Sequence, residues 1–130
     1  MADVYAMVVP TTQVGKVRFR FDEAGELIEV KMDVEDAVGV SGKRPAKAPN
    51  KAAVAAWLKA YLRAENVPFP GPWKNPGNTA FSKAVYRATA RIRAGKTLSY
   101  GEVAAKAGSP KASRAVGGAM GRNPIPLVVP

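Results

Sequence analysis

A proline-rich segment in the middle of this 130-residue chain limits how the rest can fold. Residues 66–78 read NVPFPGPWKNPGN and contain four prolines and two glycines, so they cannot form a helix and are typical of a linker. Strand-like alternation occurs only before this segment, and further helical patterns follow it. A chain of this length has room for one domain or for two small subdomains that share a core. The sequence therefore predicts two subdomains, 1–70 and 71–130.

The first forty residues have the pattern of a small antiparallel sheet with one buried face. Residues 4–10, VYAMVVP, form an apolar run, and residues 16–22, KVRFRFD, alternate strictly before a turn at 22–25. Alternation resumes in residues 27–34, LIEVKMDV. The side chains expected to face the core are Val17, Phe19, Phe21, Ile28, Val30, Met32 and Val34, whereas Lys16, Arg18 and Arg20 face outward. Residues 38–49, VGVSGKRPAKAP, are rich in Gly, Pro and Lys and are expected to form a surface loop.

Amphipathic helices are predicted on both sides of the proline-rich segment. Asn50 can cap the first helix, whose apolar stripe consists of Val54, Trp57, Leu58, Tyr61 and Leu62. The second helix is expected from about Thr79 to Arg93. Its inward residues are Phe81, Val85, Ala88 and Ile92, and its outer face carries a basic ridge of Lys83, Arg87 and Arg91, spaced four residues apart.

Two more helices follow in close succession. Ser99 and Glu102 fit a capping box, and Gly108 suits the position just after the end of this short helix. Ser109 and Pro110 then fit an N-cap and the first helical position, so a new helix is expected from there to about Met120, ending at Gly121. Two helices joined by a tight Gly-containing turn are typical of a helix-turn-helix.

The second helix of this pair has an unusual composition for one that reads DNA bases. Its sequence, SPKASRAVGGAM, offers only Lys111 and Arg114 as long polar side chains, and each of its two adjacent glycines costs about 1 kcal/mol relative to Ala. Small residues can let a helix pack tightly against its neighbours. They can also let its backbone approach the minor groove of DNA, which is only about 6 Å wide. Composition alone does not decide between the two interpretations.

The net charge of +10 is unevenly distributed. Residues 1–40 carry four basic and eight acidic side chains, whereas residues 41–130 carry sixteen basic side chains and only Glu65 and Glu102 as acids. This asymmetry indicates that the second part faces a polyanion such as nucleic acid. The chain has no Cys and no His, which argues against a transition-metal site and a thiolate nucleophile within it. No stretch has the length or character of a membrane span or signal peptide, so we expect a cytoplasmic, nucleoid-associated protein.

Residues 81–130 resemble, without gaps, the DNA-binding and active-site domain of the O6-alkylguanine-DNA alkyltransferases, the methylated-DNA–protein-cysteine methyltransferases. The most specific part is SYGEVAAKAGSPKASRAVGGAMGRNPIPLVVP, residues 99–130. Residues 11–27, TTQVGKVRFRFDEAGEL, match the family's N-terminal sheet subdomain more loosely. The resemblance implies an α/β chain of the α+β type, with a small antiparallel sheet subdomain followed by a helical subdomain that contains the helix-turn-helix.

The resemblance also implies a DNA repair function. Proteins of this family flip an O6-alkylated guanine out of the duplex and transfer the alkyl group irreversibly to a Cys of their own. Extrusion is needed because the reacting atom cannot be reached within the base stack. We therefore expect a monomer that needs no cofactor and whose partner is double-stranded DNA containing O6-alkylguanine.

Several residues match functional positions of the family. Arg114 matches the arginine that fills the gap left by the extruded base, and Tyr100 the tyrosine beside the phosphate of the flipped nucleotide. Minor-groove contacts of the family fall at Ala112, Ser113, Ala115 and Gly117, and Lys111 is expected to contact DNA as well. Asn123 matches a hinge between the recognition helix and the active site, and Met120 and Pro126 lie beside the alkyl pocket. The alternatives are packing for Tyr100 and Met120, a simple turn at residues 123–124, and solvated charges for Lys106 and Lys111.

The sequence departs from the family pattern in two places. Residues 93–95 read RAG where the family usually has PYG or PWG. The acceptor Cys, which in the family begins a Cys-His-Arg motif, is expected immediately after Pro130 and is absent from these 130 residues. Catalytic residues are therefore expected outside this chain, in a missing or separate C-terminal segment, and residues 127–129, LVV, are expected to form an exposed strand. Two alternatives are a non-catalytic alkyltransferase-like protein that binds lesions and a plain helix-turn-helix regulator.

Overall fold

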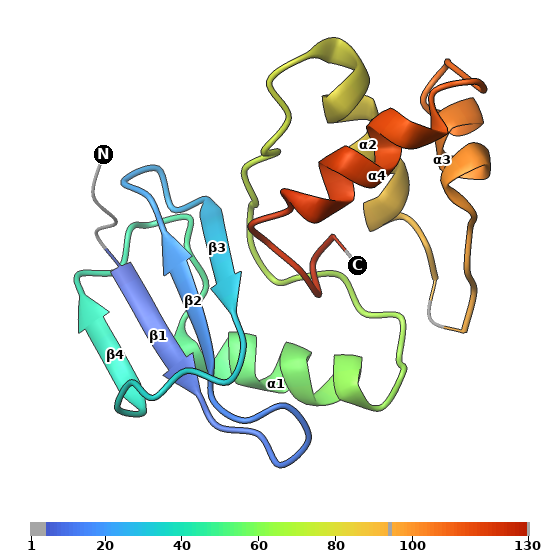
Figure 1. Ribbon diagram of the computed structural model, residues 1–130. Coiled ribbons are helices and arrows are strands. Elements are labelled where there is room, and N and C mark those ends of the chain that lie inside the picture. The colour runs from blue at the N-terminus through green and yellow to red at the C-terminus, as the bar shows by residue number, and fades with distance from the viewer. Residues whose placement is uncertain (1–4, 94, 130) are drawn as a thin grey trace. The chain divides into compact units, whose positions relative to one another are not determined.

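The computed structural model describes residues 5–93 and 95–129, which divide into two compact units, Met1–Lys74 and Asn75–Pro130 (Figure 1). Among the described residues, the first unit contains a four-stranded sheet and one helix, and the second contains three helices. The α+β fold expected from the sequence is confirmed. Ala94, in the RAG segment, and Pro130 lie outside the described residues.

The sheet of the first unit is antiparallel, with strand order β3-β2-β1-β4. Its strands are β1 (Tyr5–Val9), β2 (Val17–Phe21), β3 (Leu27–Lys31) and β4 (Gly39–Gly42). The expectation of a loop over residues 38–49 is wrong in this part, because residues 39–42 pair with β1. The sequence GVSG has little strand character, so its pairing depends on the otherwise unpaired edge of β1 and not on a local pattern.

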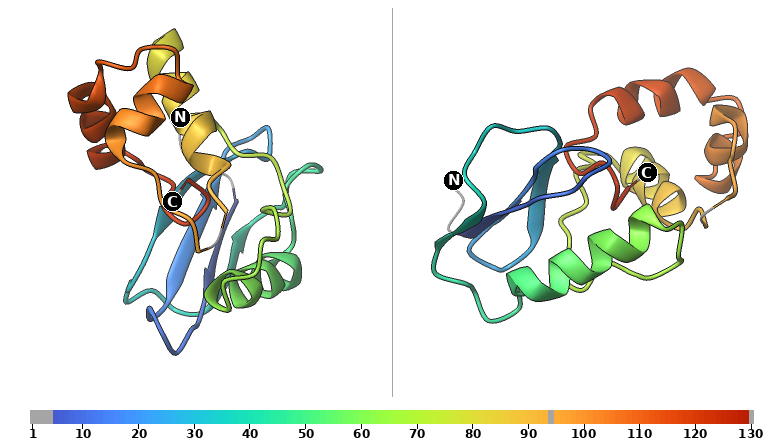
Figure 2. Two further views of the ribbon diagram at one scale, coloured as in Figure 1. Left: turned by 90° about the vertical axis from the view of Figure 1, so that its right-hand side faces the viewer. Right: turned by 90° about the horizontal axis from the view of Figure 1, so that it is seen from below.

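The buried face of the sheet follows the alternation in β2 and is covered by α1 (Lys51–Leu62) (Figures 1 and 2). Val17, Phe19 and Phe21 are fully buried. The buried residues of α1 are Val54, Trp57 and Leu58. Asn50 caps α1 by accepting a hydrogen bond from the backbone N–H of Ala53, as its sequence predicts.

The alternation expected in β3 is wrong because a bulge shifts its register. Phe19 pairs with Val30, but Phe21 pairs with Leu27, and the irregularity lies between Arg20 and Phe21. Leu27 and Val30 are therefore the buried residues of this strand, and Ile28 is not. Met32, expected in the core, lies after the end of β3 and is 37% exposed.

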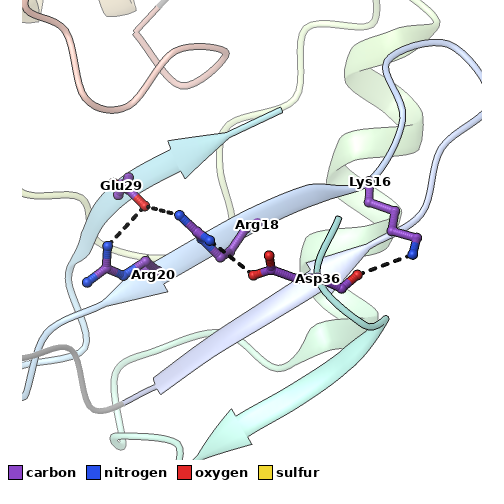
Figure 3. A network of polar contacts seen from close by, with 5 residues as sticks. All are labelled: Lys16, Arg18, Arg20, Glu29 and Asp36. Carbon is purple, nitrogen blue, oxygen red and sulfur yellow. Dashed lines mark hydrogen bonds and ion pairs between the residues drawn. The ribbon is translucent and has the colours of Figure 1, made fainter. Parts of the chain in front are cut away.

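The outer face of the sheet carries a network of charged side chains (Figure 3). Arg18 forms ion pairs with Glu29 at 3.2 Å and with Asp36 at 3.0 Å, and Arg20 pairs with Glu29 at 3.2 Å. Lys16 donates to the backbone oxygen of Asp36 at 3.2 Å. The hydrogen bond to Asp36 raises the pKa of Arg18. These contacts tie the segment before β4 to the polar face of β2.

Much of the proline-rich segment packs as part of the first unit. Phe69 contacts Trp57 edge to face, with ring centroids 5.1 Å apart, and Trp57 donates its indole N–H to the Val67 oxygen. Trp73 forms an isolated bridge with Leu27. The prolines thus exclude a helix, as predicted, but residues 67–73 do not form a free linker.

The second unit contains α2 (Ala80–Ala90), α3 (Tyr100–Lys106) and α4 (Ser113–Gly121). Thr79 caps α2 together with Ser82 in a reciprocal capping box. The predicted end of this helix at Arg93 is wrong, because after Ala90 the chain makes a tighter turn in which Ile92 N–H donates to the Thr89 oxygen. Its buried residues are Val85, Tyr86 and Thr89.

The predicted start of α4 at Ser109 is also wrong. Gly108 has φ +95° and ends α3 as predicted, and the N–H groups of Gly108 and Ser109 donate to Ala105 and Ala104, the pattern of a Schellman motif. Ser109 then accepts a turn hydrogen bond from Ala112 N–H, so residues 109–112 form a turn and α4 begins at Ser113. Ser109 therefore belongs to the ending of α3 and does not cap α4.

Candidate nucleic-acid interface

The start of α3 is fixed by the capping box that the sequence predicts. Ser99 Oγ accepts from the backbone N–H of Glu102 at 3.1 Å, and Glu102 Oε1 accepts from the backbone N–H of Ser99 at 2.9 Å. The hydrogen bond from the Ser99 backbone lowers the pKa of Glu102, with a further contribution from the Ser99 side chain. This cap holds Tyr100 at the first position of the helix.

Tyr100 stands over Gly117 of α4. A Cβ atom built on Gly117 would lie 3.1 Å from Tyr100 Cε2 and 3.4 Å from Cδ2, so the ring rests against the bare backbone of that glycine. The rest of the ring is open to solvent, since Tyr100 is 52% exposed. The absence of a side chain at Gly117 therefore has a packing role. Tyr100 remains available to an external ligand.

The outward side of α4 consists of small residues and Arg114, with the guanidinium of Arg122 lying against it. Val116 and Ala119 are buried, and helical spacing places Arg114, Gly118 and Gly121 on the opposite side. A Cβ at Gly121 would meet nothing within 4 Å, and the atoms nearest to one at Gly118 belong to the guanidinium of Arg122. Arg114 is exposed, and its side chain has no hydrogen bond or ion pair with any residue of 5–93 and 95–129. The cation Arg114 thus lies on the same side of α4 as the open backbone of Gly121.

The other residues predicted to contact DNA surround this surface. Lys111 is exposed in the turn before α4, and Ala112 is its half-buried N-cap, without a side-chain cap hydrogen bond. Ser113 and Ala115 are exposed in its first turn. The structure therefore brings together the predicted contact residues on α4, its preceding turn and the start of α3.

The packing of Tyr100 on Gly117 can be tested by a double-mutant cycle. Gly117→Ala should change the free energy of unfolding little, because a helix-propensity gain of about 1 kcal/mol is offset by the tight contact with the ring. In a Tyr100→Ala background the same substitution should stabilise the protein by about 1 kcal/mol. Urea unfolding of the four proteins measures the difference.

Gly118→Ala is the matched control for this cycle. A Cβ there would lie 3.2 Å from the flexible end of Arg122, which can move away, so its effect should be the same with or without the Tyr100 ring. Equal effects of Gly117→Ala in both backgrounds would show that the packing of the Tyr100 ring does not depend on the missing side chain at Gly117.

Two residues of α2 that the sequence pattern missed hold α4 in place. Tyr86 donates its hydroxyl to the Ala119 backbone oxygen at 2.6 Å. Thr89 donates to the Val85 oxygen at 2.8 Å, and its hydroxyl lies 3.8 Å from the sulfur of Met120, which is half-buried. The predicted inward face of α2 included Val85 but not these polar side chains, whose burial depends on partners in a distant helix.

Asn123 fastens the segment that follows α4. Its Nδ2 donates to the Val129 oxygen at 2.6 Å, and its Oδ1 accepts from the backbone N–H of Ile125 at 3.0 Å. Val129 N–H also donates to the Ile125 oxygen, and Leu127 has φ +76°. The exposed strand expected over residues 127–129 is wrong, because this segment is a turn in which Val128 and Val129 are buried. Pro126 lies half-buried within it.

The described residues show neither a metal centre nor a membrane helix. Within 5–93 and 95–129, no group of three or more His, Cys, Asp or Glu side chains is placed to hold a metal ion. None of the helices in this part of the chain is both long and apolar enough to cross a membrane.

Comparison with known proteins identifies the family. Residues 80–130 match the model of the DNA binding domain of 6-O-methylguanine DNA methyltransferase. The methylated-DNA–protein-cysteine methyltransferase of Mus musculus is 42% identical over 82 residues, 58% of this chain and 38% of the mouse protein. The constitutive enzyme of that name from Bacillus subtilis is 43% identical over 82 residues, 63% of this chain and 49% of the bacterial protein. The chain therefore spans less than half the length of these curated relatives.

Solved structures match over nearly the whole chain. The Mycobacterium tuberculosis O6-methylguanine methyltransferase in complex with DNA has 30% sequence identity and a TM-score of 0.70, and the match covers 96% of this chain and 74% of that one. A variant of the same protein gives a TM-score of 0.72 at 28% identity, with the same coverage of 96% and 74%. With the match of residues 80–130, these similarities show that the chain belongs to the O6-methylguanine-DNA methyltransferase family.

Proposed function

We propose that this chain is the sheet and DNA-binding portion of a DNA repair protein that removes alkyl groups from O6-alkylguanine. The observation that carries the proposal is the surface of α4, where Arg114, unpaired among the described residues, projects beside glycines and Tyr100 stands on Gly117. This surface lies within residues 80–130, which match the family's DNA-binding domain. We assign DNA binding to the unit 75–130 and its helix pair α3 and α4.

The geometry of α4 suits a minor-groove approach. That groove is about 6 Å wide in B-DNA, so a helix can come close only where its outward side chains are small. Gly121 leaves this side of α4 open, Gly118 is covered only by the flexible side chain of Arg122, and Arg114 supplies one long cation that can enter the base stack. In this arrangement Arg114 occupies the space left by the extruded guanine, which offsets part of the few kcal/mol that extrusion costs. We assign to Tyr100, whose exposed ring stands beside this side of α4, the contact with the phosphate of the flipped nucleotide.

Alkyl transfer requires a nucleophile that these 130 residues do not contain. In the proposed reaction a Cys thiolate attacks the alkyl carbon, a C–S bond forms, and the bond from that carbon to guanine O6 breaks. The electron pair stays with guanine, which takes up a proton. Asn123 and the turn at 123–129 would lead the chain toward that Cys, with Met120 and Pro126 beside the alkyl group.

The proposal is tested by binding and mass measurement on the same duplexes. Fluorescence anisotropy should show tighter binding to a duplex with one O6-methylguanine than to the matched guanine duplex. Intact mass after incubation should remain that of residues 1–130, because no thiol is present to take the methyl group. Equal affinity for the two duplexes would contradict lesion recognition, and a gain of one methyl mass would contradict the need for a Cys outside the chain.

A further inference from the structure

The basic ridge of α2, formed by Lys83, Arg87 and Arg91, faces away from α4. All three side chains are exposed. The opposite side of α2 is buried, where Tyr86 bonds to the Ala119 oxygen and Thr89 contacts Met120. A DNA segment held by the outward side of α4 therefore cannot also lie along the ridge.

The ridge is not neutralised within its own unit. Residues 75–130 contain nine basic side chains and a single carboxylate, Glu102. That carboxylate accepts the hydrogen bond from Ser99, and among the described residues of the unit no ion pair involves the ridge. Like charges one helical turn apart destabilise a helix by about 0.2–0.5 kcal/mol per pair. The arrangement thus costs stability unless a polyanion compensates it.

We infer that the α2 basic ridge is a second phosphate-contact surface, which binds the backbone of a DNA segment other than the one held by α4. At 1.5 Å per residue the ridge is about 12 Å long, a length over which one DNA strand presents about three to four phosphates. The inference rests on the proposed function, which supplies the first DNA segment. It adds that one protein molecule can bind two DNA segments.

DNA fits this surface better than an acidic protein does. Protein interfaces are centred on buried aromatic or other apolar anchors. No large hydrophobic side chain is exposed on α2. The ridge offers only long cations between alanines, which suits the sequence-independent attraction to phosphates.

Bridging of two DNA segments can be measured directly. Two duplexes, one carrying O6-methylguanine and a donor dye and the other undamaged with an acceptor dye, should give energy transfer when the protein is added. We expect about tenfold less bridging, or lower still, from the triple variant Lys83→Gln, Arg87→Gln and Arg91→Gln. The slope of the logarithm of the bridging constant against the logarithm of salt concentration should fall in magnitude by up to about 3. Its affinity for the single lesion duplex should stay within about threefold of the unmodified protein. Gln is a good helix former, so α2 should remain intact, as circular dichroism can verify.

A matched triple variant removes the same charge from the first unit. Lys43, Lys47 and Lys59 are exposed there, and replacing them with Gln should leave bridging unchanged. Equal losses in both triple variants, or no bridging by the unmodified protein, would overturn the inference. The inference would also be overturned if polyglutamate displaced DNA from the ridge at a lower concentration of negative charge than a competing duplex does. Failure of the proposed function would be seen separately, as a lack of preference for the lesion duplex.

Discussion

Replacing Arg114 with alanine is expected to remove most of the preference for O6-methylguanine DNA over undamaged DNA. The side chain is exposed and makes no hydrogen bond or ion pair with the described residues, so its loss should not destabilise the fold. A specific side-chain contact to a base in a groove contributes about 1–3 kcal/mol, which corresponds to roughly 5- to 150-fold in affinity. The ratio of dissociation constants for the two duplexes, measured by anisotropy at fixed salt, should fall by a factor in this range.

Two lysines provide the controls for this prediction. Lys106 at the end of α3 and Lys111 in the turn before α4 are exposed, and we expect them to attract phosphates without distinguishing bases. Lys106→Ala and Lys111→Ala should weaken binding to both duplexes equally and reduce the salt slope by about 1 each. If Arg114→Ala also weakened both duplexes equally, Arg114 would be another phosphate contact and its assignment to the extruded-base position would be wrong.

Local signals in the sequence predict much of this fold. Asn50 and the Ser99–Glu102 pair cap their helices as expected, and Gly108 ends α3 with positive φ. The alternation of β2 places Val17, Phe19 and Phe21 in the core. Each of these features depends on residues at most four positions apart, where propensity and spacing act directly.

The predictions that failed depend on distant partners. β4 forms because β1 offers a free edge, although GVSG has no strand pattern. The bulge opposite Arg20 changes which residues of β3 are buried, and a single-strand pattern cannot show it. Ser109 followed by Pro110 satisfies the local rule for a helix start, but the Schellman motif of α3 uses the Ser109 N–H.

The contacts within the candidate site could not be predicted from the sequence, and the functional roles of its residues stay predictions. The family resemblance indicated Arg114, Tyr100 and Asn123 by position, and composition left the role of the small residues in α4 open. The structure gives Gly117 a packing role under Tyr100 and leaves Gly121 open on the outward side, so packing explains one glycine and the minor-groove approach stays a prediction for the other. Such contacts join residues 17 positions apart and cannot be read from helical spacing.

Asn123→Ala is expected to destabilise the second unit by about 2–3 kcal/mol. The substitution removes the hydrogen bonds from Asn123 Nδ2 to the Val129 oxygen and from Ile125 N–H to Asn123 Oδ1, each with a net value of about 1 kcal/mol. It also leaves the Ile125 N–H, which belongs to a fully buried residue, without this partner, which adds to the loss. Urea unfolding followed by far-ultraviolet circular dichroism measures the change.

Comparison of three variants shows whether Asn123 acts through both hydrogen bonds. Asn123→Asp keeps the acceptor for Ile125 N–H and loses the donor to the Val129 oxygen. If the two hydrogen bonds contribute separately, its loss of stability should lie between zero and that of Asn123→Ala. Asn78→Ala removes an exposed asparagine of the same unit and should change stability by less than about 0.5 kcal/mol. Because the turn at 123–129 lies outside α3 and α4, affinity of Asn123→Ala for undamaged DNA should be retained below the unfolding transition. Unchanged stability of Asn123→Ala would mean that the buried side chains of Ile125, Val128 and Val129, and not Asn123, hold this turn.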